Sequence, residues 1–378
     1  MMRLCFVDLA PWDYDVATPT IKPLGGSQSA LCYLAIKLAK AGHNVTVLTG
    51  TTKPGIVCDV ECLSVEANLN QWFFQYSKFD AVVVLNAPSY GAKLRGIMPP
   101  STRLILWTHH AANQIAMRKL EQPDIRDAWD CIVCVSDWQA RDVMERFGCD
   151  PARVTVLRNA IAPAFEGLFD SKSHLSAVKS GTPHQLVYTS TPYRGLQFLA
   201  SIFPAYRADH PEATLDAYSS MAVYMESQEK DRRQFSHIYD VLGEIGGVRL
   251  LGSLPQPDLA KRLTAAHIWA YPNAFPETSC IAAMEAMAAG LQIVTSDLGA
   301  LPETCAGFAK LVPIDIEIDD DNASIMVKGG DTYTAAFTEA LLESRSDPAT
   351  LWSQVRHMND NHTWSVRARE WVEHLNAA

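Results

Sequence analysis

Short, continuous apolar runs alternate with longer amphipathic segments along this chain. Runs that are apolar throughout are typical of parallel strands buried on both faces of a sheet. Together with helices at Ser27–Ala41 and Trp138–Phe147, they predict a doubly wound, Rossmann-like α/β domain over residues 1–165. Its predicted strands are Arg3–Ala10, Asn44–Thr49, Ala81–Asn86, Arg103–Thr108, Cys131–Ser136 and Arg153–Leu157.

The alternation restarts after a break rich in proline, glycine and serine between Ala160 and His184, which is predicted to be a linker. A second doubly wound domain is therefore expected over residues 182–362, with a last helix over 363–378 packing back towards the first domain. Two such domains facing across a cleft bind ligands at the carboxyl ends of their strands. The predicted strands are Gln185–Ser190, Thr214–Tyr218, Val248–Leu251, Ile268–Pro272 and Gln292–Thr295, and the helices are Leu196–Asp209, Asp258–Ala266 and Ser279–Ala289.

Charge and composition exclude several classes of protein. The 378 residues carry a formal charge of -10, and the acidic excess lies after Phe165, which argues against broad nucleic-acid binding. No polybasic run supports contact with a membrane surface, and no apolar stretch approaches the roughly 20 residues that span a bilayer. We therefore expect a cytoplasmic protein. The nine cysteines, including the Cys131 and Cys134 pair, are predicted to be reduced core thiols.

The segment Pro276–Gly290 carries the strongest indication of a binding site. Thr278 or Ser279 is predicted to cap a helix whose first amides, from Thr278 to Ile281 through Ser279 and Cys280, face an anion such as a diphosphate. Glu285 shares the apolar face of that helix, where an ionised carboxylate needs a partner such as paired ribose hydroxyls. Glu277 lies just ahead of the helix. The alternative is an ordinary helix with one tolerated glutamate.

Three further segments follow or precede predicted elements in a way that suits a sugar nucleotide. Gly25, Gly26 and Ser27 open the first long helix, where a bare backbone can approach an anion. His109 follows a strand and can exchange hydrogen bonds with a sugar hydroxyl. Arg194 can bind phosphate with two parallel hydrogen bonds. Plain loop geometry, a structural hydrogen bond and an exposed arginine are the respective alternatives.

Glu277 and Glu285 are separated by seven residues and followed by EAMAAG, and this arrangement resembles the E-x7-E signature of retaining glycosyltransferases of family four, the glycosyl transferases group one, on the GT-B fold. The flanking text is similar to the same family in three stretches, and the resemblance extends from the first strand to about residue 310. The stretches are LLGSLPQPDLAKRLTAAHIWAYPNAFPETSC, SDLGALPETCAG and VSDWQARDVMERFGCDPARVTVLRNAI, the last of which includes Asn159.

The resemblance implies transfer of a sugar, with retention of configuration, from a UDP-, GDP- or ADP-sugar to a glycan, lipid-linked or small-molecule acceptor, as in polysaccharide biosynthesis. It places His109 and Glu277 at the reacting sugar and Glu285 on the ribose. Gly25–Ser27, Arg194 and Thr278–Ile281 would surround the diphosphate, with no cofactor and no metal. The chain departs from the family at Ser190 and Thr191, where a second base usually helps to bind the phosphates.

Two other functions stay open at this stage. One is a different enzyme on the GT-B fold, either a nucleotide-sugar epimerase or a phosphorylase, and the other is a nucleotide-sugar-binding protein without catalysis. The acidic run Asp315–Asp321 is predicted to be a solvated surface loop, with a site for a hard cation as the alternative. The sequence names neither the base, nor the sugar, nor the acceptor.

Overall fold

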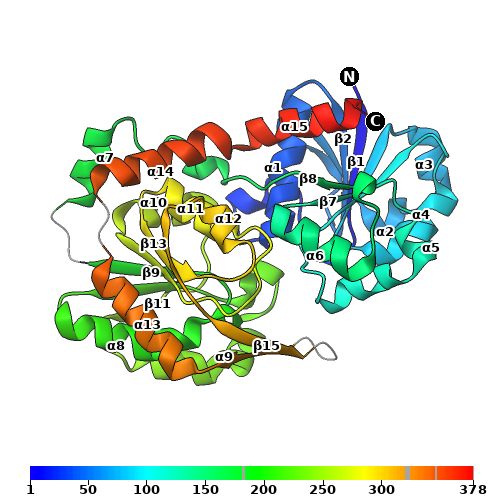
Figure 1. The fold of residues 1–378 in the computed structure, drawn as a ribbon. Helices are drawn as coiled ribbons and strands as arrows, with labels where there is room; N and C mark the ends of the chain where they lie inside the picture. Colours follow the sequence, from blue (N-terminus) through cyan, green and yellow to red (C-terminus); the bar gives the residue numbers. More distant parts are fainter. Residues whose placement is uncertain (181–183, 320–323, 345–346, 378) are drawn as a thin grey trace. The chain divides into compact units, whose positions relative to one another are not determined.

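The computed structural model describes residues 1–180, 184–319, 324–344 and 347–377. The chain divides into two compact units (Figure 1). Unit 1 comprises Met1–Ile21, Gly25–Ala160 and Trp364–Ala378, and unit 2 comprises Lys22–Leu24 and Ile161–Thr363. Each unit contains a twisted, mainly parallel sheet with helices on its faces, which confirms the predicted pair of doubly wound α/β domains.

The sheet of unit 1 has the strand order β3-β4-β2-β1-β5-β6-β7-β8. Its centre is β1, which is buried from Leu4 onward and pairs in parallel with β2 and β5. The sequence prediction missed β3 and β4, because β3 is short and exposed and pairs with β4 in an antiparallel hairpin. The strands are β1 (Arg3–Asp8), β2 (Asn44–Thr49), β3 (Gly55–Val57), β4 (Val60–Ser64), β5 (Ala81–Leu85), β6 (Arg103–Trp107), β7 (Cys131–Cys134) and β8 (Val154–Val156).

The C-terminal helix α15 (Trp364–Asn376) belongs to unit 1. It packs on α1 (Gly26–Lys40), where Lys37 Nζ donates to Ser365 Oγ at 3.0 Å and the Tyr33 and Trp364 rings lie 6.3 Å apart. Because α1 is covered by α15 as well as by the sheet, its residues from Gln28 to Ala35 are all buried. The other helices are α2 (Val65–Asn68), α3 (Gln71–Ser77), α4 (Gly91–Ile97), α5 (Pro123–Arg126) and α6 (Asp137–Phe147), with 3₁₀ turns η1 (Thr18–Thr20), η2 (Pro88–Tyr90), η3 (Ile115–Glu121) and η4 (Pro151–Arg153).

The main sheet of unit 2 is parallel throughout, in the order β11-β10-β9-β12-β13-β14. The acidic run was predicted to be a surface loop, and this prediction was wrong for residues 315–319. They form a strand that pairs in a separate antiparallel hairpin. Along this strand the aspartates and Glu317 are exposed while Ile316 and Ile318 are half-buried, the alternation of a strand with one covered face. Asp320 and Asp321 lie outside the described residues. The strands are β9 (Gln185–Thr189), β10 (Thr214–Tyr218), β11 (Val248–Leu250), β12 (Ile268–Tyr271), β13 (Gln292–Ser296), β14 (Ala309–Val312), β15 (Asp315–Asp319) and β16 (Ser324–Lys328).

A helix also lies within the segment predicted to be a linker. It is α7 (Lys172–Lys179), which Ser171 caps at His174 N and which buries Leu175 beside Phe169 and Val355. Residues 181–183 of that segment lie outside the described part. The remaining helices are α8 (Leu199–Asp209), α9 (Gln228–Gly243), α10 (Gln256–Ala265), α11 (Ile281–Ala288), α12 (Leu301–Cys305), α13 (Gly330–Glu343) and α14 (Pro348–Asn361), with 3₁₀ turns η5 (Pro163–Phe165), η6 (Pro192–Arg194), η7 (Leu196–Phe198) and η8 (Met221–Tyr224).

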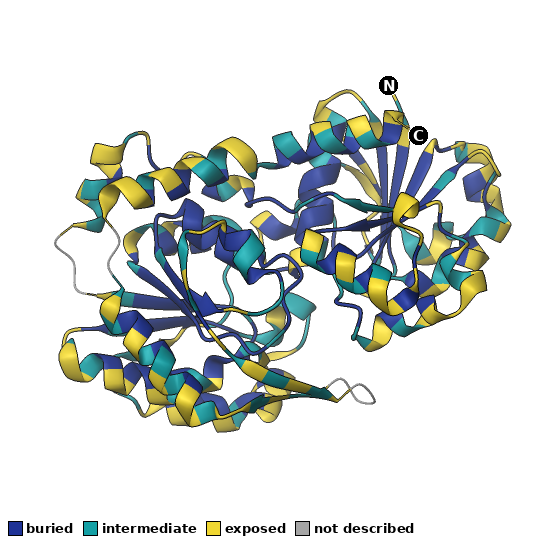
Figure 2. Ribbon diagram, viewed as in Figure 1, coloured by how far each residue is buried: buried dark blue, intermediate teal, exposed yellow. Residues whose placement is uncertain are grey.

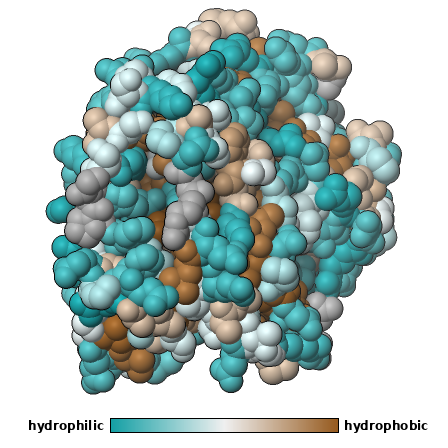
Figure 3. Space-filling view, turned by 60° about the vertical axis from the view of Figure 1, so that its left-hand side comes forward, coloured by the Kyte–Doolittle hydropathy of each residue, from teal (hydrophilic) through white to brown (hydrophobic). Residues whose placement is uncertain are grey.

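Burial follows this layering in both units. The central strands are buried and the outward faces of most helices are exposed (Figure 2). On the face drawn in Figure 3, hydrophilic side chains predominate and hydrophobic ones show between them. All nine cysteines are free, and eight of them are buried, including Cys131 and Cys134 in β7 as predicted, whereas Cys58 is exposed and does not belong to the core. Within the described ranges, no helix combines the length and the apolar content needed to cross a bilayer.

Candidate active site

The polar residues that lead into α11 are buried. Glu277 is 5% exposed, Thr278 8% and Ser279 3%. The predicted cap was wrong, because α11 begins at Ile281 and its N-cap is Cys280, in the left-handed conformation with φ 36°. The helix starts later than predicted because residues 278–280 form the turn that brings the chain into it. No side chain caps the first turn, so this helix start can serve an anion.

The Ser279 hydroxyl supplies a second sign of a ligand at this turn. Its oxygen is buried and has no hydrogen-bond partner among the described residues, whereas the Ser279 carbonyl accepts a bond from Thr304 Oγ1 at 3.0 Å. A buried hydroxyl without a partner costs free energy, on the order of 1–3 kcal/mol. An anion at the start of α11 would accept a hydrogen bond from this hydroxyl and remove that cost.

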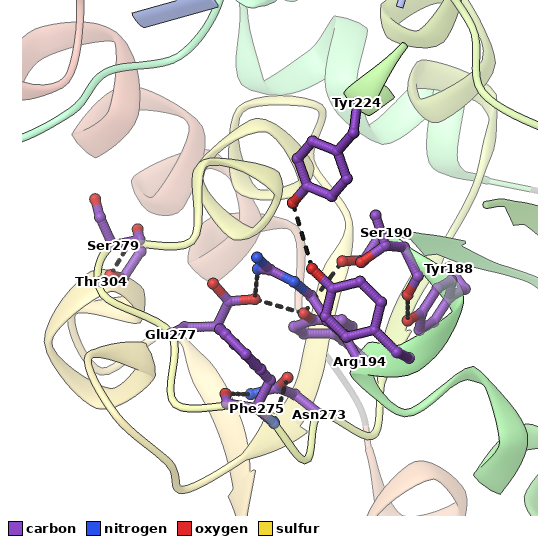
Figure 4. A network of polar contacts seen from close by, with 12 residues as sticks. Tyr188, Ser190, Arg194, Tyr224, Asn273, Phe275, Glu277, Ser279 and Thr304 are labelled. Atoms are coloured by element: carbon purple, nitrogen blue, oxygen red, sulfur yellow. Dashed lines mark hydrogen bonds and ion pairs between the residues drawn. The ribbon is translucent and has the colours of Figure 1, made fainter. Parts of the chain in front are cut away.

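Glu277 is held by two donors to the same oxygen. Arg194 Nη1 and the Tyr271 hydroxyl donate to Glu277 Oε1 at 2.5 and 2.6 Å (Figure 4). The Arg194 guanidinium also lies over the Phe275 ring, 4.5 Å from its centroid. The structure thus brings together two of the predicted residues that are 83 positions apart. Arg194 is fixed in place before any ligand arrives, which favours binding of an anion of defined geometry.

Two glycines let neighbouring loops approach these residues. Gly299 has φ +62°, and a Cβ there would lie 2.5 Å from the Glu277 carbonyl oxygen, which accepts a hydrogen bond from Ala300 N at 2.7 Å. Gly195 has φ +117°, and a Cβ there would meet the Pro272 carbonyl oxygen at 2.0 Å. Only glycine fits both the dihedral angle and the space at these two positions.

Four tyrosines surround the Arg194–Glu277 pair, and the sequence prediction included none of them. Besides Tyr271 they are Tyr188, whose hydroxyl donates to the Thr191 carbonyl at 2.8 Å, and Tyr193 and Tyr224, whose hydroxyls lie 3.4 Å apart. Tyr188 and Tyr271 were counted as apolar strand residues. Their positions at the carboxyl ends of β9 and β12 are the signal that could have identified them.

Glu285 lies within α11 and is 3% exposed. It accepts a hydrogen bond from the backbone N–H of Ala162 at 3.3 Å and one from the Gln256 side chain. Burial nevertheless raises its pKa to about 8, so the carboxyl group is mostly protonated at neutral pH. The apolar surroundings inferred from the sequence are confirmed.

In unit 1, His109 follows β6 and is anchored by two asparagines. Its backbone N–H donates to Asn86 Oδ1 at 2.7 Å, and its Nε2 lies 3.1 Å from Asn159 Oδ1. The imidazole packs against Trp107, with ring centroids 4.9 Å apart. Burial lowers the pKa of His109 to about 3, so the ring is neutral at physiological pH.

Gly25 is the N-cap of α1, and no side chain caps this helix start either. Gly25 is buried, Gly26 exposed and Ser27 half-buried. Neither glycine has a positive φ, so this loop has no left-handed backbone conformation. Its distinguishing feature is a backbone without side chains at these two positions. The Gln28 side chain donates to Asp8 Oδ2 at 3.1 Å and thereby ties the first turn of α1 to the end of β1.

The chain is similar to known proteins in sequence and in fold. Residues 184–347 match the family model of glycosyl transferases group 1, and the predicted GT-B fold is confirmed. This confirms the resemblance seen in the motifs. The structure is similar to Anabaena HepE in complex with UDP-glucose, with a TM-score of 0.68, 15% identity and complete coverage of both chains.

Two curated relatives share about a quarter of their aligned residues with this chain. The chain is 24% identical over 346 residues to phosphatidyl-myo-inositol mannosyltransferase of Mycolicibacterium smegmatis, covering 83% of this chain and 81% of the relative. It is 25% identical over 216 residues to one of the subunits of human phosphatidylinositol N-acetylglucosaminyltransferase, covering 57% of this chain. The match spans 41% of the human relative's length.

Proposed function

We propose that this protein transfers a sugar from a nucleotide-diphosphate sugar to the hydroxyl group of an acceptor, with retention of anomeric configuration. One observation carries the proposal: the buried Arg194–Glu277 pair stands directly before the uncapped start of α11, where the Ser279 hydroxyl has no protein partner in the described structure. This arrangement is suited to an anion that carries a polar group beside it. A diphosphate joined to a sugar has that form.

The donor is proposed to lie along α11. The backbone amides of Thr278–Ile281 and the guanidinium of Arg194 would bind the diphosphate. Glu285, about one turn into the helix, would receive the two ribose hydroxyls. Glu277 would face the transferred sugar, since its second oxygen, Oε2, is left for another donor. The solved complex of the similar HepE with UDP-glucose supports a donor of this class.

Unit 1 is proposed to serve the acceptor. His109 is neutral and held by Asn159, so it can accept or donate a hydrogen bond without adding charge. Gly25, Gly26 and Ser27 leave uncapped backbone amides at the start of α1, which suits an anionic group of a ligand. The names of both curated relatives refer to phosphatidylinositol or its myo-inositol form, which favours a lipid-linked acceptor over a free glycan or a small molecule.

In the proposed reaction the bond between the anomeric carbon and the β-phosphate oxygen breaks, and a bond from that carbon to the acceptor oxygen forms on the same face. The electron pair leaves with the nucleoside diphosphate, and the acceptor proton goes to its phosphate. The charge of Arg194 and the dipoles of the α11 amides are fixed in position and would stabilise the leaving group. No three carboxylate, histidine or cysteine side chains of the described chain converge as metal ligands, and we propose that no metal is needed.

A binding screen followed by a transfer assay tests the proposal. We expect UDP, GDP or ADP, or one of their sugars, to raise the melting temperature, because a ligand that binds only the folded state stabilises it. Glu285→Ala should weaken nucleotide binding, while Glu277→Ala and His109→Ala should mainly lower turnover. If no nucleotide binds, the proposal is wrong. Labelled donor separates transfer to an acceptor from epimerisation, phosphorolysis or binding alone.

A further inference from the structure

The proposed diphosphate site contains little positive charge. Arg194 is the one basic residue of the segment Ser190–Gly195, and Ser190 and Thr191 stand where the resembled family has a second base. The Arg194 guanidinium is already paired with the Glu277 carboxylate at 2.5 Å, so the two charges cancel locally. A diphosphate with two negative charges would therefore meet a site whose side chains sum to zero charge.

Two phenol groups stand where further donors are needed. Tyr193 is the residue next to Arg194 in η6, and its ring centroid lies 5.7 Å from Arg194 Cζ. Tyr224 ends η8, and its hydroxyl lies 3.4 Å from that of Tyr193. In Figure 4 the Tyr224 hydroxyl points towards the space beside Arg194. These turns follow β9 and β10, which are neighbouring strands.

We propose that the Tyr193 and Tyr224 hydroxyls are the second arm of a phosphate clamp and donate hydrogen bonds to the donor's diphosphate opposite Arg194, in place of a second base. The proposal rests on the proposed function, since it assumes that a nucleoside diphosphate binds beside Arg194. Phenol hydroxyls are effective donors to phosphate oxygens, and the Tyr193–Tyr224 contact is long enough for a phosphate to replace it at little cost.

The clamp has a measurable electrostatic consequence. A second cation would make binding of a dianion strongly dependent on ionic strength, whereas neutral donors are hardly screened by salt. We therefore expect nucleoside diphosphate affinity to change less than about threefold between about 50 and 500 mM NaCl. Ser190→Arg, which places a base at the family position, should tighten binding at low salt and make the salt dependence steeper.

The experiment compares Tyr193→Phe and Tyr224→Phe with the unaltered protein by calorimetric titration. The probes are UDP, GDP or ADP, whichever binds the unaltered protein, and the matching nucleoside monophosphate. Each variant should bind the diphosphate about tenfold more weakly, the loss of one hydrogen bond to a charged group, and the monophosphate within about twofold. Tyr239→Phe is the matched control, because its hydroxyl donates to Asp231 in α9 and should not affect either ligand.

The outcomes separate this inference from the proposed function. If the unaltered protein binds none of the diphosphates, the proposed function fails first. If it binds one and both phenylalanine variants bind it equally well, the clamp is wrong while the proposed function stands. If diphosphate and monophosphate affinities fall together, the tyrosines only support the fold of the site, and this result also overturns the clamp. A steep salt dependence in the unaltered protein contradicts it as well.

Discussion

The carboxyl edges of the two sheets carry very different chemistry on the same doubly wound architecture. At the edge of unit 1, His109 lies between Asn86 and Asn159, all neutral groups that hydrogen-bond with one another. At the edge of unit 2, Arg194 and Glu277 form a buried ion pair. The shared architecture sets where a site can lie, and the residues after each strand decide whether it can serve a neutral or an anionic ligand.

This difference also has an energetic side. Neutral groups can be buried at low cost when each has a hydrogen-bond partner, as around His109. Buried charges lose several kcal/mol of hydration each and need well-placed partners. Unit 2 bears that cost at the Arg194–Glu277 pair, whereas Glu285 avoids most of it because burial raises its pKa to about 8 and keeps it protonated at neutral pH. Substitutions and pH changes at the two edges test whether they differ in this way.

The largest effect is expected from Arg194→Ala. This substitution leaves the Glu277 carboxylate buried without its cation, which should lower the free energy of unfolding by about 3–5 kcal/mol. Chemical denaturation measures this change. The control is Arg232→Ala, which removes an exposed pair with Asp240 and should cost less than about 1 kcal/mol. Equal losses in the two variants would show that the unit 2 edge is no more charge-dependent than the surface.

The next effect is the pH dependence that Glu285 gives to stability. Its pKa rises from 4.5 to about 8 on folding, so between these values the folded state holds a proton that the unfolded state lacks. The stabilisation is complete below pH 4.5 and is lost as the pH rises towards 8. Glu285→Gln should remove this loss and be more stable than the unaltered protein by about 2–4 kcal/mol at pH 8, but not at pH 4.5. Denaturation at both values checks the sign, and a difference independent of pH would contradict it.

Much of the fold was predictable because its strands are apolar throughout. The runs ending at Asp8, Thr49 and Tyr218 were located to within two residues. The β3–β4 hairpin and the β15–β16 hairpin were missed, since exposed strands take their stability from pairing, which a single segment does not reveal.

The site was predictable where a motif carries its chemistry in sequence order. The spacing of Glu277 and Glu285 placed both on α11 and its approach, and the apolar face of Glu285 was confirmed. The tyrosines around Arg194 were not predicted, because a strand tyrosine has the same pattern whether its hydroxyl is buried in a network or faces water. α11 starts late because Cys280 has a left-handed backbone conformation. Cysteine has no particular preference for this conformation, so the residue type did not reveal it.

A smaller effect is expected from Gly299→Ala. The new Cβ would lie 2.5 Å from the Glu277 carbonyl oxygen and require a left-handed alanine, which should cost about 1–3 kcal/mol and displace Glu277. Gly307→Ala is the matched control, with φ +82° and no atom within 4 Å of the added carbon, so only the backbone cost of about 1 kcal/mol remains. Melting curves and turnover measure both. Turnover retained in Gly299→Ala would show that the site tolerates movement of Glu277.

The smallest observable change, and the sharpest contrast with Glu285, is expected in the NMR titration of His109. Burial lowers its pKa to about 3, so between about pH 3 and 6.5 the unfolded state holds a proton that the folded state lacks. The contribution of His109 to stability therefore increases up to about pH 6.5 and is constant above it, the opposite slope to Glu285. In NMR spectra the His109 ring proton shift should not change between about pH 5 and 8, whereas in denaturant all histidines should titrate near 6.5. Titration of His109 near pH 6.5 in the folded protein would mean that the edge of unit 1 carries charge at working pH. Both edges would then carry charge, and they would differ only in how much.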